Sequence, residues 1–337
     1  MRPSVRFIAA LLSFAVAACP ALAANVRADD PLAPQPEQSA AEQTAFGIAY
    51  SDLYRIDLGT RVATYLGTTG LYGGQLIGQM RGLSYGPDGS LYGVSGNLKA
   101  LFKINASNGV ATYVGPLGLV GTGQFGALDL SMTYGCNGQF WLSSAVTGQL
   151  WKVDPQTAAP TLIGSMGHKI TGIVAYGDML YGASGQGETG FYSIDKNTAQ
   201  STLIGSYGSD VAFANVVALS FDSTGTLYSS LSYNPGPTST SPLVDWSDLA
   251  TIDIHTGAIT KLGAITGPVS RLRGVSMNGF VVAPTQCDVG PPPPPPPPPY
   301  SYTPVPSASL PMLAILALLL IGAGILGKHA ITSVSRR

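Results

Sequence analysis

An internal repeat is the feature of this chain that most limits its fold. Each copy runs from an apolar–aromatic strand ending in Asp or Asn, through a turn of small polar residues, to an apolar residue followed by Gly. The five copies lie at residues 53–67, 101–115, 150–164, 191–205 and 249–263. Corresponding positions are 48, 49, 41 and 58 residues apart. A period in the forties made only of strand signals predicts the blades of a β-propeller.

A second strand pair in each repeat completes four strands per blade. The clearest pair is residues 82–85 and 90–94, joined by Gly86-Pro87-Asp88-Gly89, where Pro and Gly suit a tight turn. The counterparts are expected at 130–134 with 139–143, 172–176 with 179–183, and 217–221 with 226–230.

The two ends of the repeat region complement each other. Residues 46–50 take the place of a second strand, and residues 274–277 and 280–283 read as an inner strand pair without partners. Joining them would close the ring and remove exposed sheet edges. The prediction is therefore an all-β, five-bladed propeller over residues 46–288, with six blades as the alternative if one end pair stands alone.

The repeat also resembles a known superfamily. The phrase Leu-Tyr-x-Ile-Asp, a Thr/Gly turn and Thr-x-Leu/Ile-Gly, across roughly residues 46–285, is similar to exported bacterial propellers of the quinoprotein-like and NHL-like type. The resemblance implies the fold. It implies no particular chemistry, because such repeats occur in enzymes, scaffolds and adhesins.

The N-terminus has the pattern of an export signal. Arg2 and Arg6 precede an apolar segment at 7–17 and a small-x-small site at 21–23, which predicts a signal peptide over residues 1–24. Residues 25–45 are expected to be disordered. An alternative is a lipoprotein box ending at Cys19, which would then be lipidated.

The C-terminus has the pattern of a membrane anchor. Residues 310–327 are uncharged and are followed by the basic tail 328–337. At 1.5 Å per residue this stretch spans roughly 27 Å, close to the ~30 Å hydrocarbon core of a bilayer, so a transmembrane helix with a cytoplasmic tail is expected. Nine prolines at 291–299 predict a polyproline II stalk within residues 289–309, roughly 28 Å long over the prolines.

This end of the chain resembles the PEP-CTERM and IPTL-CTERM sorting signals of Gram-negative bacteria. Val305-Pro306-Ser307 stands where their short motif lies, ahead of the apolar stretch and the basic tail. The resemblance implies membrane anchoring, with processing by an exosortase-type protease as a hypothesis. The expected location is therefore periplasmic or at the cell surface.

Two cysteines remain after removal of the signal, Cys136 and Cys287. An even pair in an exported protein predicts a disulfide that fastens the end of the chain to the propeller, with two unpaired buried thiols as the alternative. No Cys-x-x-Cys or His cluster accompanies them, so neither a metal nor a cofactor is predicted.

Charge and motifs narrow the function. Only 10% of residues are charged, the net charge is −1 and there is no basic stripe, which argues against nucleic-acid binding. The chain has no Gly-x-Ser-x-Gly, His-Glu-x-x-His or Gly-rich phosphate loop. We therefore expect a non-catalytic binding or structural surface module. Its expected partner is an extracellular polysaccharide, a matrix component or an envelope protein; the alternative is a propeller-type lyase or lactonase.

The candidate site is the mouth of the central channel, formed by the loops that enter each innermost strand. Its functional groups are Arg81, Asp129, His168, Lys169, Asp210, Asn215, Arg271 and Arg273. The cations could receive a carboxylate, sulfate or sugar acid, although solvated loop positions are the simpler interpretation and the one we favour. The long insertion at 232–248 adds Tyr233 and Trp246, which, if exposed, could hold a glycan or a protein; ordinary surface decoration is the alternative.

Two repeated positions are expected to be structural. The Asp or Asn that ends each repeat strand should begin a turn rather than bind calcium, because its side chain bonds the backbone two residues on. The repeated aromatics Tyr54, Phe102, Trp151 and Tyr192 are expected to pack between blades rather than to hold a sugar.

Overall fold

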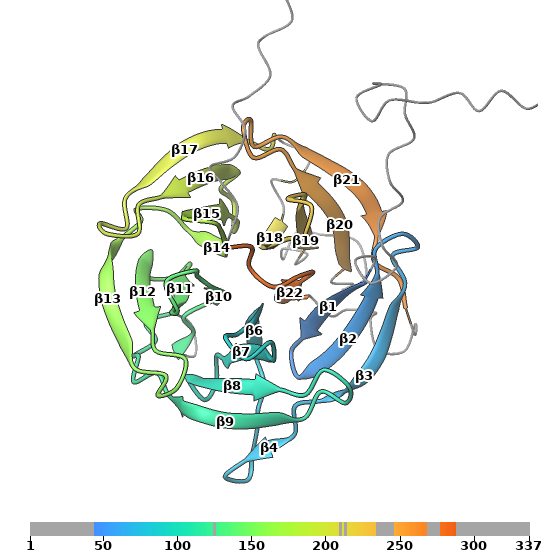
Figure 1. Ribbon diagram of the computed structural model, residues 1–337, viewed down its shortest axis with the longest axis vertical. Helices are drawn as coiled ribbons and strands as arrows, with labels where there is room; N and C mark the ends of the chain where they lie inside the picture. Colours follow the sequence, from blue (N-terminus) through green and yellow to red (C-terminus); the bar gives the residue numbers. More distant parts are fainter. Residues whose placement is uncertain are drawn as a thin grey trace, which may run out of the picture.

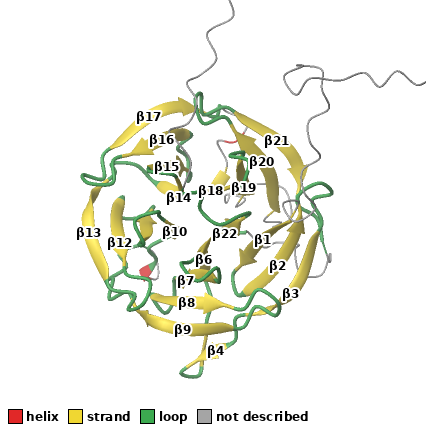
Figure 2. Cartoon of the chain, in the orientation of Figure 1, coloured by secondary structure: helices red, strands yellow, loops and turns green. Residues whose placement is uncertain are grey.

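The computed structural model describes residues 44–123, 126–208, 211, 214–233, 246–267 and 277–287. Strands and their connecting loops make up nearly all of the described residues (Figure 2). Five four-stranded sheets stand around a common axis as the blades of a propeller (Figure 1). The five-bladed prediction is therefore confirmed.

Blades 2 to 5 each use four consecutive strands, numbered from the axis outward. Blade 2 comprises β6 (Met80–Tyr85), β7 (Leu91–Ser95), β8 (Ala100–Ile104) and β9 (Ala111–Pro116). Blade 3 comprises β10 (Leu130–Tyr134), β11 (Phe140–Ser144), β12 (Gln149–Val153) and β13 (Pro160–Ser165). Blade 4 comprises β14 (Ile170–Tyr176), β15 (Met179–Ser184), β16 (Gly190–Ile194) and β17 (Ser201–Ser206). Blade 5 comprises β18 (Ala214–Phe221), β19 (Leu227–Tyr233), β20 (Trp246–Ile252) and β21 (Ile259–Ala264).

Blade 1 is built from both ends of the chain, as predicted. Its order is β22 (Gly279–Val281), β1 (Thr44–Ala49), β2 (Asp52–Asp57) and β3 (Ala63–Thr68). One C-terminal strand completes the sheet, because β1 already holds the second place. The expected partner strand at 274–277 falls almost wholly outside the described residues. A parallel bridge between Val62 and Thr266 joins blades 1 and 5 at the rim as well.

Hydroxyl groups fasten neighbouring innermost strands to each other. Each accepts a hydrogen bond from a backbone N–H of the next blade; the pairs are Ser84 with Tyr134, Ser131 with Ile173, Thr133 with Ala175, Thr171 with Val217, and Ser220 with Val282. The N–H of Gly82 completes the circle by donating to the Asn278 carbonyl at 3.3 Å. A space of about 10 Å³ remains on the axis, roughly enough for one water molecule.

The two structural expectations for the repeat are confirmed. In every copy the Asp or Asn side chain accepts backbone N–H groups of its own turn; for example, Asp154 Oδ1 lies 2.7 Å from Gln156 N and 3.1 Å from Thr157 N. Asn105, Asp195 and Asp253 also accept the N–H two residues on, whereas Asp57 accepts the N–H of Thr60, three residues on, at 2.7 Å. The repeated aromatic side chains are all buried, because they point into the apolar layers between blades.

The terminal segments predicted from sequence fall outside the described residues. These are the signal peptide at 1–24, the stalk at 289–309, the apolar stretch at 310–327 and the basic tail. Among the residues that are described, no helix has the length and apolar character needed to cross a membrane.

Candidate functional site

The propeller has two faces, one at each end of its axis. The loops that enter β6, β10, β14 and β18 lie at one end of the axis, which we call the mouth face. The turns that leave these strands lie at the opposite end, which we call the turn face. All the candidate residues of the channel-mouth loops that the structure describes therefore lie on the mouth face.

Arg81 and Asp129 meet on the mouth face. The Arg81 Nη2 atom lies 2.9 Å from Asp129 Oδ1, and Gln186 donates its Nε2–H to Asp129 Oδ2 at 2.8 Å. The Arg81 and Asp129 side chains are 20% and 21% exposed. Burial lowers the pKa of Arg81 while the Asp129 charge opposes the shift, and an arginine stays charged under such conditions. The cluster thus joins blades 2, 3 and 4.

Two residues of this cluster have left-handed backbone conformations. Asp129 has φ of 47° and Gln186 has φ of 53°. Such conformations are uncommon for residues other than glycine. Asp129 thus lies between two donors from other blades, Arg81 of blade 2 and Gln186 of blade 4.

His168 and Lys169 form a second cluster on the mouth face of blade 4. The His168 ring stacks on Tyr192 with a centroid separation of 4.4 Å, and His168 Nδ1 lies 3.4 Å from Glu188 Oε2. The backbone N–H of Lys169 donates to the same Glu188 oxygen at 3.3 Å. Burial and the Glu188 charge raise the pKa of Tyr192.

Sequence reasoning missed Gln186 and Glu188. Both lie in the loop between β15 and β16, whereas the sequence analysis considered only the loops that enter innermost strands. The signal available was the segment Gly185-Gln-Gly-Glu-Thr-Gly190, in which two functional side chains stand among glycines.

The remaining candidates have mixed outcomes. Asn215 is the second residue of β18 and lies at the mouth edge of its blade. Asp210, Arg271 and Arg273 fall outside the described residues. Trp246 begins β20 opposite Tyr233, and its side chain is not described.

Tyr233 is buried, so the expectation that it is exposed on the insertion is wrong. Its side chain is 6% exposed and belongs to the apolar core between blades 4 and 5, because β19 continues through this residue. Burial, followed by the Asp248 charge, raises the pKa of Tyr233. The Lys261 ammonium lies 5.3 Å from the ring centroid.

A short hairpin, not predicted from sequence, projects from the rim of the propeller (Figure 1) and belongs to the mouth-face loop that enters β6. It consists of β4 (Leu71–Tyr72) and β5 (Gln75–Leu76). Gly73 and Gly74 have φ of 57° and 77°, as a type I′ turn requires. The signal was present, since Gly-Gly between Leu71-Tyr72 and Gln75-Leu76 favours such a hairpin.

Hydrogen bonds and ring stacking connect the hairpin segment to blade 2, but several of its apolar side chains are exposed to solvent. Asn97 accepts the N–H of Gly78 at 3.2 Å and donates to the Leu76 carbonyl at 2.8 Å. Tyr72 stacks on Tyr113 with 4.3 Å between centroids. Leu71 is nevertheless 69% exposed, and Tyr72 and Leu76 are exposed too.

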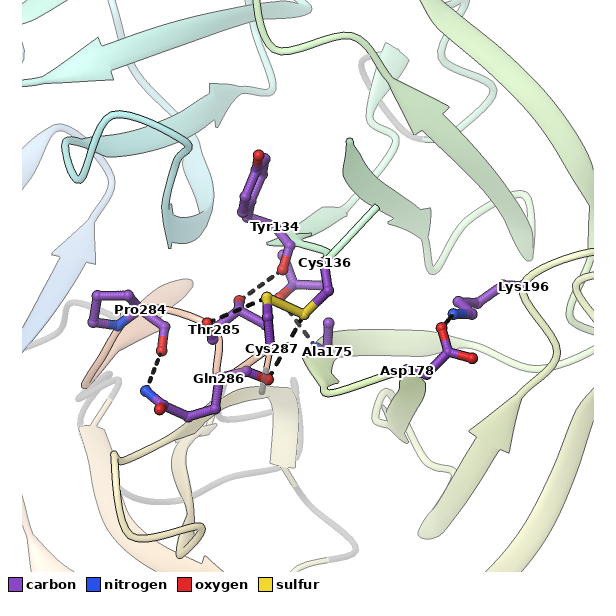
Figure 3. Close-up of a disulfide and its surroundings, with 10 residues drawn as sticks. Tyr134, Cys136, Ala175, Asp178, Lys196, Pro284, Thr285, Gln286 and Cys287 are labelled. Atoms are coloured by element: carbon purple, nitrogen blue, oxygen red, sulfur yellow. Dashed lines mark hydrogen bonds and ion pairs between the residues drawn. A yellow bond between two sulfur atoms is a disulfide. The ribbon is translucent and has the colours of Figure 1, made fainter. Parts of the chain in front are cut away.

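The turn face carries the disulfide and the end of the described chain. Cys136, in the turn between β10 and β11, is bonded to Cys287, so the predicted pairing is confirmed. Thr285 donates to the Tyr134 carbonyl at 2.7 Å (Figure 3), and the Gln286 carbonyl accepts the N–H of Gly177 at 2.8 Å. Ala283, Pro284 and Thr285 also line the small axial space, so these three residues cover this end of the axis.

Open grooves on the turn face lie between the two turns of a blade. Those in blades 2 and 4 have volumes of about 410 and 350 Å³, and one of about 540 Å³ lies on blade 5 beside Tyr176 of blade 4. The Asp or Asn in each groove already bonds its own turn. Among the described residues, no group of three or more His, Cys, Asp or Glu side chains could hold a metal ion.

No family model matches this chain, and no curated protein matches it in sequence. Solved structures similar to it include a nidogen/laminin complex, at 10% identity and a TM-score of 0.45 over 72% of this chain and 99% of that one. Virginiamycin B lyase from Staphylococcus aureus is similar at 13% identity and a TM-score of 0.37, over 64% and 63% of the two chains. The PQQ-bound aldose sugar dehydrogenase from Streptomyces coelicolor is similar at 16% identity and a TM-score of 0.36, over 60% and 86%. The propeller assignment itself comes from the sheet topology of this chain.

Proposed function

We propose that this protein is an exported, membrane-tethered β-propeller that presents its mouth face outward as a non-catalytic binding surface. The observation that carries the proposal is the position of Cys287 on the turn face. Cys287 is covalently fixed to the turn face, and the predicted stalk and anchor follow it in sequence. A tether attached there would leave the mouth face, at the other end of the axis, pointing away from the membrane.

The chemistry of the mouth face favours a protein partner. Both carboxylate oxygens of Asp129 are engaged within the Arg81 cluster, whereas the projecting hairpin holds Leu71, Tyr72 and Leu76 in solvent. Large contiguous patches of exposed apolar side chains mark protein interaction sites. The partner we propose is therefore a protein of the cell envelope or matrix. Many propellers on one membrane would bind a partner that is present in many copies more tightly than a single propeller would, through avidity.

Binding of the full chain, purified in detergent, to isolated cell envelopes tests this function. Leu71→Ser/Leu76→Ser should weaken saturable binding by about tenfold or more, the scale expected when interface residues worth ~1–2 kcal/mol are lost. Leu162→Ser/Leu203→Ser is the matched control, since these leucines are exposed on the outer strands β13 and β17. Equal binding by both double variants would show that the hairpin is not part of the contact surface.

Treatment of the envelopes identifies the partner class. Protease should abolish binding and periodate should leave it intact. The opposite result would replace the protein partner with a polysaccharide, and no saturable binding by the unaltered protein would contradict a binding function. The tether is tested separately by fractionation: the full chain should sediment with membranes, and a chain ending at residue 309 should not.

A further inference from the structure

The closing strand of the ring is short and lies next to the point where the chain leaves the propeller. β22 pairs with β1 in antiparallel register through Phe46 with Val281, Gly47 with Phe280 and Ile48 with Gly279. These three residue pairs form its whole ladder with β1. β22 runs toward the turn face, so tension on the residues after Val281 would draw it lengthwise out of the ring.

Losing β22 would open the ring. Phe280 and Val281 are buried in the cores on either side of blade 1. The N–H of Met277 donates to Ser247 Oγ at 3.2 Å, and its carbonyl accepts from Ser232 Oγ at 2.7 Å. Withdrawal of β22 would break these contacts with blade 5 and leave β1 as a bare edge.

The chain does not leave the propeller directly after β22. It crosses the turn face, where Val282 bonds Ser220 of blade 5, Thr285 bonds Tyr134 of blade 3, and Gln286 bonds Gly177 of blade 4. The covalent bond of Cys287 to Cys136 comes last (Figure 3). Among the described residues, the disulfide is thus the last contact along the chain that attaches this segment to the propeller.

We infer that the Cys136–Cys287 bond is a force-bearing clamp, which carries tension from the tether into blade 3 and keeps it off β22. This inference rests on the proposed function only in taking the C-terminal tether as the source of tension. Residues 282–286 lie inside the loop that the disulfide closes, so tension applied beyond Cys287 does not reach them.

Cys136, to which the disulfide transfers the tension, lies in a part of blade 3 with more strand pairing than β22 has. Cys136 lies in the turn between β10 and β11, which pair through five residues from Leu130 with Ser144 to Tyr134 with Phe140. β11 is itself paired with β12. Tension on this turn is therefore shared by two strands joined through five residue pairs, whereas tension on β22 falls on one end strand joined to β1 through three.

Single-molecule pulling tests the clamp on the full chain in detergent, with handles at its two ends. Thr44 and Val281 lie at the same end of the β1–β22 pair, so without the clamp tension separates this pair one rung at a time. The oxidised protein should show no early step. After reduction in the instrument, a low-force step should appear before global unfolding, with a length of up to roughly 40 Å if residues 277–287 are released.

Two variants sharpen the test. Cys136→Ser/Cys287→Ser should show the early step without reductant. Thr285→Val removes the bond to the Tyr134 carbonyl but keeps the disulfide, so it should behave as the oxidised protein does. An early step in the oxidised protein, or none after reduction, overturns the clamp. Neither outcome bears on whether residues 310–327 anchor the chain, because fractionation decides that independently.

Discussion

A β-carbon on Gly67 of blade 1 would lie 1.8 Å from the carbonyl oxygen of Asn108 in blade 2. Asn108 belongs to the turn that follows Asn105, so the outermost strand of one blade ends against the turn of the next. The same relationship joins Gly115 to Thr157, Gly164 to Thr198, and Gly205 to Thr256. These contacts explain why the repeat contains both a turn and an apolar residue followed by Gly. The Gly near the end of each of these outermost strands leaves room for the turn of the next blade.

Gly67→Ala should destabilise the propeller by about 1–3 kcal/mol or more, the scale of overpacking a tight contact. The atom in the way is backbone oxygen, which cannot rotate aside as a flexible side chain would. Gly59→Ala is the matched control, because its β-carbon would meet only Asp57 Oδ1 at 3.5 Å. Urea denaturation of the two variants measures the difference, and equal stabilities would show that the contact relaxes freely.

Removal of the disulfide should lower the free energy of unfolding by up to about 5 kcal/mol, the chain-entropy limit for a loop of this length. The two cysteines are 151 residues apart, so the bond constrains much of the unfolded chain. Denaturation curves with and without reductant measure the effect. Cys136→Ser/Cys287→Ser should match the reduced protein and ignore reductant; a curve unchanged by reduction contradicts the prediction.

Asp129→Ala should destabilise by about 1–3 kcal/mol, because it leaves the largely buried Arg81 guanidinium without its carboxylate. The double variant Arg81→Met/Asp129→Ala should recover part of that loss, since it removes the unpaired charge as well. A double-mutant cycle by urea denaturation gives the coupling, expected at about 0.5–3 kcal/mol. Additive effects would show that the 2.9 Å pair contributes no coupling energy.

The turn aspartates should make stability fall in acid. The backbone N–H groups of Gln156 and Thr157 lower the pKa of Asp154 below the ordinary value of 3.8. The backbone N–H and the hydroxyl of Thr60 lower the pKa of Asp57 in the same way. Their folded-state pKa lies below the unfolded value. Their contribution is therefore complete above the unfolded value and is lost as the pH falls through the folded one.

Asn105 shows how to test this acid dependence, because its amide oxygen accepts the Ser107 N–H at 2.8 Å without a charge. Asp57→Asn/Asp154→Asn should keep most of the stability at pH 7 and flatten the loss between about pH 4 and pH 2. Denaturation at several pH values measures the slope. A slope identical to that of the unaltered protein would assign the acid sensitivity to other groups.

The blades were predictable because their signals are local and occur five times. The expected strand at 130–134 coincides with β10, and the strand at 82–85 differs from β6 only at its start. Tyr233 was misplaced because the recognisable strand pattern ended at residue 230. The pairing of β19 with β20 continues into the insertion, as far as Tyr233 with Trp246.

The mouth site was predictable as an inventory but not as an arrangement. Arg81 and Asp129 were both named, yet their pairing and the role of Gln186 depend on three blades closing around one axis. The disulfide was foreseen from the number of cysteines alone. The path of residues 283–287 across the turn face to blade 3 is set by tertiary packing, which no local pattern encodes.

The composite blade has a consequence for how the chain is made. β1 is among the first strands to leave the ribosome, and its inner partner β22 is the last strand of the described chain. The chain is synthesised from its N-terminus, so all the strands of blades 2 to 5 have been made before the innermost strand of blade 1. Completion of the ring is therefore a late event, and it leaves the edge of β1 unpaired in every nascent copy until then.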